Sequence, residues 1–105
     1  MSTYTITRVV KEKGGKYVSI EVGADKYCTI NNACITGDFF AFPPEVIDEI
    51  EKYLKGRRVT RSLIETIMSL INSAVLVGVS REKFQSLLIN VLEEVSKACK
   101  VNAEN

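Results

Sequence analysis

The stretch from Ile35 to Gly56, ITGDFFAFPPEVIDEIEKYLKG, most constrains what this chain can fold into. It starts as the end of a strand, turns at Gly37-Asp38, passes through an aromatic segment and continues as a helix. Glycine adopts positive φ freely and aspartate tolerates it, so Gly37-Asp38 predicts a turn. Pro43-Pro44 cannot continue a strand ladder but suits a first helical turn, and Gly56 suits the left-handed position after a helix. The chain therefore divides here into strands before and helices after.

Three strands are predicted ahead of the turn. Residues 3–12 and 16–22 are rich in β-branched residues with a period of two, and Lys13-Gly14-Gly15 between them predicts a hairpin. The third strand, residues 27–36, changes the phase of its apolar positions at Asn31-Asn32. Because a one-residue slip would turn half of these side chains to solvent, we predict a bulge at that point.

Three helices are predicted after the turn, each with apolar residues at helical spacing. The first starts near Pro44, with Asp38 as the nearest carboxylate that could cap it. The second runs from the N-cap Thr60 to about Val75, and the third from Arg81, capped by Ser80, to about Lys100. The polar tail from about residue 101 is expected to fray.

This order predicts one α+β domain over residues 1–105, in which three helices pack on one face of a three-stranded antiparallel sheet. The other face, which carries Tyr17, Ser19 and Glu21, is expected to stay open. At least one sheet edge is also expected to be free, and such an edge is a natural docking place for another chain.

The residue types exclude several classes of function. The chain has no histidine, which removes Ser-His-Asp triads, Cys-His pairs and zinc sites with histidine ligands. A net charge of +1 indicates neither a nucleic acid nor a membrane surface as partner. The longest apolar run, Ala74–Val79, is too short to span a bilayer, and the N-terminus lacks the pattern of a secretory signal. We therefore expect a cytoplasmic protein.

Three cysteines, Cys28, Cys34 and Cys99, make a closed disulfide framework unexpected because their number is odd. Cys28 and Cys34 lie too far apart on an extended strand to ligate one ion, so no metal site is predicted. The favoured interpretation is that the cysteines are small, buried and inert.

Several motifs together resemble the C-terminal accessory domain of lipoate–protein ligases. They are the Ile35-Thr36-Gly37-Asp38-Phe39-Phe40 corner, Pro44-Glu45, Leu54-Lys55-Gly56, and Gly78 before Arg81-Glu82-Lys83-Phe84. The resemblance covers residues 14 to about 88. It implies a fold similar to that of sulfur-acceptor and iron–sulfur scaffold proteins.

The resemblance also implies a function. In this family a large catalytic domain, which is a separate polypeptide in some organisms, works with a small domain of this size. The pair makes lipoyl-AMP from lipoate and Mg-ATP and then passes the lipoyl group to a lysine of an acceptor protein. We therefore expect a non-catalytic accessory subunit that is no enzyme on its own, carries no catalytic residue and binds no cofactor by itself. Its expected partners are the catalytic subunit, which would hold lipoate and Mg-ATP, and, indirectly, the lipoyl-acceptor proteins.

The candidate residues for the partner interface are Gly37, Asp38, Phe39, Phe40 and Phe42. Asp38 has two interpretations, a contact to the partner or an ordinary turn and helix-capping carboxylate. Phe39, Phe40 and Phe42 also have two interpretations, core packing or an interface anchor. Phe39 and Phe40 point in opposite directions on an extended segment, so both can be buried only if each side is covered, and otherwise one of them is free to anchor an interface.

A secondary candidate site is the basic patch Arg57, Arg58 and Arg61, next to Lys52 and Lys55. It would contact phosphate or an acidic partner, or else be a solvated helix end that matches the helix dipole. Two other functions stay open. One is a sulfur acceptor or iron–sulfur scaffold using a reactive thiol, and the other is a homodimer formed through the open sheet face.

Overall fold

The computed structural model describes residues 4–11 and 16–103. The elements follow in the order β1 (Tyr4–Lys11), β2 (Tyr17–Ala24), β3 (Ile30–Gly37), β4 (Phe40–Phe42), α1 (Val46–Leu54), α2 (Arg61–Asn72), β5 (Val75–Val77) and α3 (Arg81–Ala103). The predicted strands and helices are all present. The hairpin predicted at Lys13-Gly14-Gly15 lies outside the described residues.

The three long strands form an antiparallel sheet in the order β1-β2-β3. The pairing of β2 with β3 changes from Gly23↔Asn32 to Ala24↔Ile30, so Asn31 is the extra residue of a bulge. The predicted bulge is therefore confirmed. It keeps the apolar residues on both sides of it, Ile30 and Ala33, in the core.

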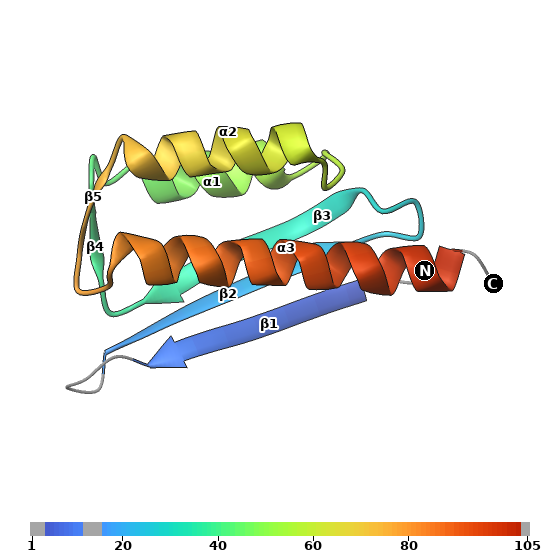
Figure 1. The fold of residues 1–105 in the computed structure, drawn as a ribbon, viewed down its shortest axis with the longest axis horizontal. Coiled ribbons are helices and arrows are strands. Elements are labelled where there is room, and N and C mark those ends of the chain that lie inside the picture. The colour runs from blue at the N-terminus through green and yellow to red at the C-terminus, as the bar shows by residue number, and fades with distance from the viewer. Residues whose placement is uncertain (1–3, 12–15, 104–105) are drawn as a thin grey trace.

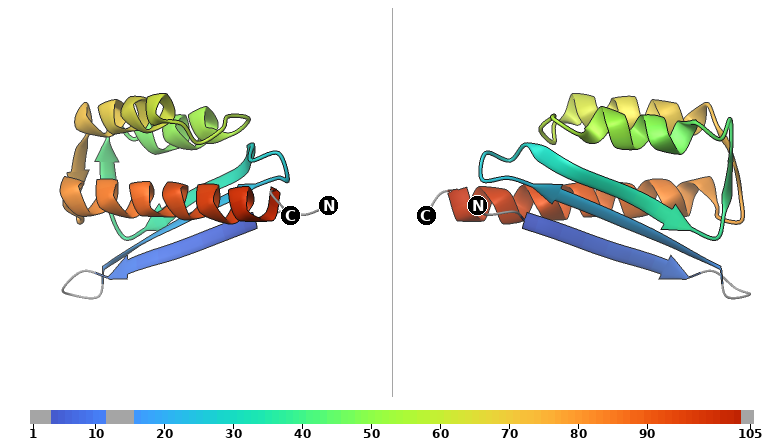
Figure 2. Two further views of the ribbon diagram at one scale, coloured as in Figure 1. Left: turned by 45° about the vertical axis from the view of Figure 1, so that its right-hand side comes forward. Right: turned by 180° about the vertical axis from the view of Figure 1, so that it is seen from behind.

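The helices all lie on the same side of this sheet (Figures 1 and 2). Helix α3 covers β1 and β2, α1 covers β3, and α2 packs on α1 and α3. The core between them is purely hydrophobic, with Ile20, Leu54, Ile67, Leu88 and Val91 fully buried. The predicted α+β fold is confirmed. On the opposite face Tyr17 is exposed, and no described helix covers the sheet there.

The two sheet edges differ. On β3, the backbone N–H of Ile35 donates to a Glu51 carboxylate oxygen of α1 at 2.7 Å. The N–H and C=O of Ile30 bond to Arg57 and Gly56, at 2.8 and 2.7 Å. The segment after α1 thus closes this edge, whereas β1 has β2 as its one strand neighbour. The free edge expected from the sequence is that of β1.

The predicted side-chain caps are present on α2 and α3 but not on α1. The Thr60 hydroxyl accepts from the N–H of Leu63, and the Ser80 hydroxyl accepts from that of Lys83, as expected. Helix α1, in contrast, has no side-chain cap, and the capping role considered for Asp38 is wrong. Asp38 lies in the bend after β3, where its own N–H donates to the Tyr17 carbonyl at 2.8 Å.

Two segments differ from the prediction. Residues 27–29, expected as strand, form a loop, because Asp25 Oδ1 accepts the N–H groups of Tyr27 and Thr29 and holds a tight turn. The second helix ends at Asn72, and Val75–Val77 forms β5, paired antiparallel with β4. This two-stranded sheet was not predicted, because its two strands are short and far apart in the sequence.

The cysteines also differ from the prediction. Cys28 and Cys99 form a disulfide across 71 residues of sequence, and Cys34 is exposed. Cys28 takes a left-handed conformation, φ 66°, in the loop after β2, which brings it against the last turns of α3. The pairing was not predicted, because the number of cysteines is odd and because residues 27–29 were expected to be strand. None of the helices in the described part of the chain combines the length and apolar character needed to cross a membrane.

Candidate functional site

The β4–β5 ribbon lies at one end of the molecule (Figure 1). It presents an exposed apolar surface. Phe40 lies opposite Val77, and Phe42 opposite Val75, so all four side chains share one face of the ribbon. Their exposed fractions are 67% for Phe40, 55% for Phe42, 57% for Val75 and 48% for Val77. We call these four residues the ribbon patch.

The other face of the ribbon holds it on the core. Ala41 and Leu76 pair across the strands, and they point inward, Ala41 buried and Leu76 half-buried. Phe39 packs against the core as well, with its ring centroid 5.7 Å from that of Phe84 in α3. Because alternate residues of a strand face opposite ways, anchoring Phe39 and Ala41 directs Phe40 and Phe42 outward.

Two glycines fix the position of the ribbon. A side chain at Gly37 would collide with the Tyr17 carbonyl oxygen, so the turn into β4 can lie against β2 only with glycine there. Gly78 follows β5 with φ +101°, and a Cβ there would lie 3.0 Å from the Asp38 oxygen and 3.2 Å from Phe39 Cα. The entry to β4 and the exit from β5 therefore touch backbone to backbone.

A hollow of about 430 Å³ adjoins the ribbon patch. It lies between the Ile35–Phe40 corner and α1, and Phe40, a residue of the ribbon patch, also lines it. The lining residues are Ile35, Thr36, Gly37, Phe39, Phe40, Ala41, Pro44 and Ile47. A partner side chain could enter this hollow while the partner covers the patch.

The predicted interface residues thus fall into a structural group and an exposed group. Gly37 and Phe39 shape and anchor the corner from inside, whereas Phe40 and Phe42 are exposed on one face. Asp38 is exposed in the bend. The prediction that Phe39 and Phe40 face opposite ways is confirmed.

Val75 and Val77 were missed as members of this surface. Val75 continues the helical spacing of apolar residues, which predicts that it belongs to the second helix. The signal that could have found them is the run Val75-Leu76-Val77, since β-branched residues at alternate positions favour a strand.

The basic candidates lie at the other end of the molecule. The Arg57 guanidinium stacks on the Tyr53 ring at 4.0 Å, and its Nε donates to the Tyr53 carbonyl at 2.8 Å. Arg57 and Arg58 line a common hollow, and Arg61, at the start of α2, does not line it. Of the three predicted arginines, the two that are adjacent in the chain share a hollow, and Arg61 is not part of its lining.

The described residues contain no group of three or more histidine, cysteine, aspartate or glutamate side chains that could hold a metal ion. Cys34, the free thiol, lies within β3 opposite Glu21, whose carboxylate accepts from Thr7 and Asn32 at 3.1 and 2.8 Å. Reactive thiols usually lie near positive charge, and this one faces an acid. The sulfur-acceptor alternative thus has one exposed thiol, in unfavourable surroundings.

A model of the family described as bacterial lipoate protein ligase C-terminus matches residues 4–88. The chain belongs to this family. The match begins ten residues earlier than the resemblance seen in the sequence, because it includes β1, and it ends at the same place. No curated protein matches the chain.

A solved structure is also similar to this lipoate ligase domain. It comes from a structural analysis of an archaeal lipoylation system, a bi-partite lipoate protein ligase and its E2 lipoyl domain, from Thermoplasma acidophilum. The identity is 26% and the TM-score 0.59, over 83% of this chain and 97% of that one. Because almost all of the other chain is covered, the likeness is to a whole chain and not to one domain of a longer one.

Proposed function

We propose that this lipoate ligase domain is a non-catalytic accessory subunit of a split lipoate–protein ligase. It works with a separate catalytic subunit, which binds lipoate and Mg-ATP. The pair forms lipoyl-AMP, and the lipoyl group then passes to a lysine of an acceptor protein. The family match and the whole-chain likeness to a chain from a bi-partite ligase support this role.

The ribbon patch is the observation that carries the proposal. An aromatic side chain has about 200 Å² of surface, so the exposed fractions of Phe40 and Phe42 leave roughly 250 Å² of aromatic surface in water. With the two valines the patch reaches the size of the largest apolar patch on a typical monomer, which is often functional. We assign the ribbon patch to the interface with the catalytic subunit, because interfaces between permanent partners are more hydrophobic than transient ones.

Adenylation tests this function directly. The catalytic subunit, lipoate and Mg-ATP are mixed with and without this chain, and the release of pyrophosphate is followed in the absence of acceptor. We expect the chain to increase the rate strongly and to form a stable complex with the catalytic subunit. An equal rate with and without the chain would show that the accessory role is wrong.

Sedimentation of the isolated chain separates this proposal from a homodimer. The accessory role predicts a monomer that shifts to a larger complex only when the catalytic subunit is added. A dimer that stays intact and excludes the catalytic subunit would instead favour self-association.

A further inference from the structure

Asp38 lies next to the ribbon patch on a backbone that is held from two sides. Its own N–H donates to the Tyr17 carbonyl at 2.8 Å. Its carbonyl oxygen lies against Gly78, where a Cβ would approach it to 3.0 Å. The bend between β3 and β4 is therefore fixed by main-chain contacts, and it presents the exposed Asp38 side chain directly before β4.

The carboxylate of Asp38 has no structural task. Within the described part of the chain it accepts no hydrogen bond and joins no ion pair. Three other acids of the sheet and its surroundings are all in use. Glu21 accepts from two neighbouring strands, Asp25 holds its own loop, and Glu51 closes the edge of β3. Asp38 is thus available to a partner.

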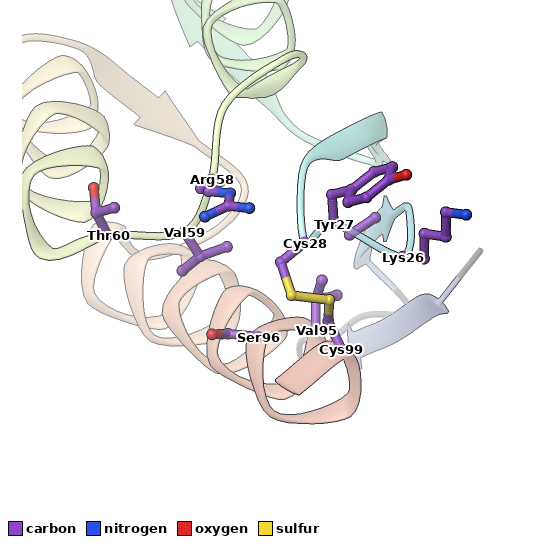
Figure 3. A pocket seen from close by; sticks show the side chains of 10 residues that line it. Lys26, Tyr27, Cys28, Arg58, Val59, Thr60, Val95, Ser96 and Cys99 are labelled. Carbon is purple, nitrogen blue, oxygen red and sulfur yellow. A yellow bond between two sulfur atoms is a disulfide. The ribbon is translucent and has the colours of Figure 1, made fainter. Parts of the chain in front are cut away.

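The cations of this chain are placed elsewhere. Arg81, at the start of α3, donates to the Ala74 carbonyl at 2.9 Å. Lys26 and Arg58 border a pocket of about 460 Å³ on the disulfide, at the end of the molecule away from the ribbon (Figure 3). A cation that pairs with Asp38 therefore comes from another molecule.

The area of a stable interface brings Asp38 inside it. A specific complex buries about 800 Å² on each partner, whereas the two phenylalanines of the ribbon patch expose roughly 250 Å². A circular interface of that size, centred on the patch, has a radius of about 16 Å. Asp38 precedes Phe40 by two residues, about 7 Å along an extended chain. A partner that covers the patch therefore also covers Asp38.

A covered carboxylate needs a partner of its own. An ionised group that loses its water without gaining a cation or hydrogen-bond donors weakens an interface severely. The four side chains of the ribbon patch are hydrocarbon, so they offer no donor. An arginine or lysine supplies both the opposite charge and short, strong hydrogen bonds.

We propose that Asp38 pairs with an arginine or lysine of the catalytic subunit when that subunit covers the ribbon patch. The apolar contacts are non-directional, and the ion pair beside them selects one orientation of the partner. It also rejects proteins that offer an apolar surface without a cation. This inference rests on the proposed function, and it adds a chemical feature that the catalytic subunit must carry.

Removal of the charge at Asp38 tests the ion pair. Asp38→Asn keeps the shape of the side chain, and Glu93→Gln is the matched control, at an exposed position about 18 Å along α3 from its start. We expect the Kd for the catalytic subunit to rise about tenfold or more in Asp38→Asn and about a hundredfold or more in Asp38→Lys. Glu93→Gln should stay within about twofold.

Salt and heat provide two further readouts. Between about 0.05 and 0.5 M salt, the Kd of the wild-type chain should rise more steeply than that of Asp38→Asn, because salt screens the ion pair. The thermal unfolding of Asp38→Asn should match that of the wild-type chain, since its carboxylate accepts no hydrogen bond among the described residues. A loss of affinity with unchanged unfolding therefore reports on the interface and not on the fold.

A charge exchange identifies the cation. Each exposed arginine and lysine of the catalytic subunit is changed to glutamate, and its binding to Asp38→Lys and to the wild-type chain is measured. One of these changes should restore binding to Asp38→Lys and weaken binding to the wild-type chain. If none of them restores binding, the catalytic subunit does not supply the cation.

Two other results would overturn the proposal. Equal affinity of Asp38→Asn and the wild-type chain would show that the carboxylate lies outside the interface. Unchanged affinity together with a higher Mg²⁺ requirement for adenylation would make Asp38 a ligand of the metal instead. Failure of the wild-type chain to bind the catalytic subunit or to stimulate adenylation would refute the proposed function itself, and it needs no substitution to be seen.

Discussion

Truncation of Phe40 gives the sharpest test of the ribbon patch. Phe40 is 67% exposed, which corresponds to about 130 Å² of a phenylalanine surface near 200 Å². Covering this area is worth up to about 3 kcal/mol at about 25 cal/mol per Å². Interface anchors of this kind commonly cost about 2 kcal/mol or more when truncated. We therefore expect Phe40→Ala to weaken binding to the catalytic subunit about thirtyfold or more.

Titration calorimetry with the catalytic subunit measures this loss, and Tyr27→Ala is the matched control. Tyr27 is also an exposed aromatic residue, at 62%, but it lies in the loop after β2 and not on the β4–β5 ribbon, so its truncation should leave this affinity unchanged. Phe40→Ala should change the free energy of unfolding by less than about 0.5 kcal/mol, because the ring is already in water. Its adenylation rate should recover when more of the variant is added.

The reasoning would be refuted by one clear result. If Phe40→Ala and the double variant Phe40→Ala/Phe42→Ala both bind the catalytic subunit as tightly as the wild-type chain does, the ribbon patch is not the docking surface. A large loss of stability on truncating Phe40 would also contradict its exposed position.

Three further predictions concern the fold. Cys99→Ser removes the disulfide across 71 residues and should lower the free energy of unfolding by up to about 4 kcal/mol, measured by denaturant melts; Cys34→Ser, at the exposed thiol, should have almost no effect. Gly78→Ala should lower the free energy of unfolding by more than Gly56→Ala does, because Gly78 combines a positive φ with close backbone contacts, whereas Gly56 has a positive φ and open space around it. We expect about 1 kcal/mol for Gly56→Ala, and equal losses in a denaturant melt would contradict the close approach at Gly78. Phe39→Ala should destabilise the chain by about 2 kcal/mol or more in thermal unfolding, unlike its exposed neighbour in sequence, because it packs on the core.

Some features were predictable because they depend on residues close together in the chain. The period of two in β1 and β2, the helical spacing in α1 and α3, and the capping by Thr60 and Ser80 are local patterns with one physical reading. The bulge at Asn31 followed from the phase of the apolar residues alone. The GDFF corner also indicated the family, which the match over residues 4–88 confirms.

Other features depend on contacts between residues that are distant in the chain, and only the tertiary structure reveals them. Val75 continues the helical spacing of the second helix, although the β-branched residues of Val75–Val77 favour a strand, and the pairing with Phe40–Phe42 selects the strand and completes the ribbon patch. The Cys28–Cys99 bond likewise exists because a tight loop and the end of α3 meet in space. Local sequence determines which conformations are favourable, but cross-strand and cross-helix contacts supply the free energy that selects among them.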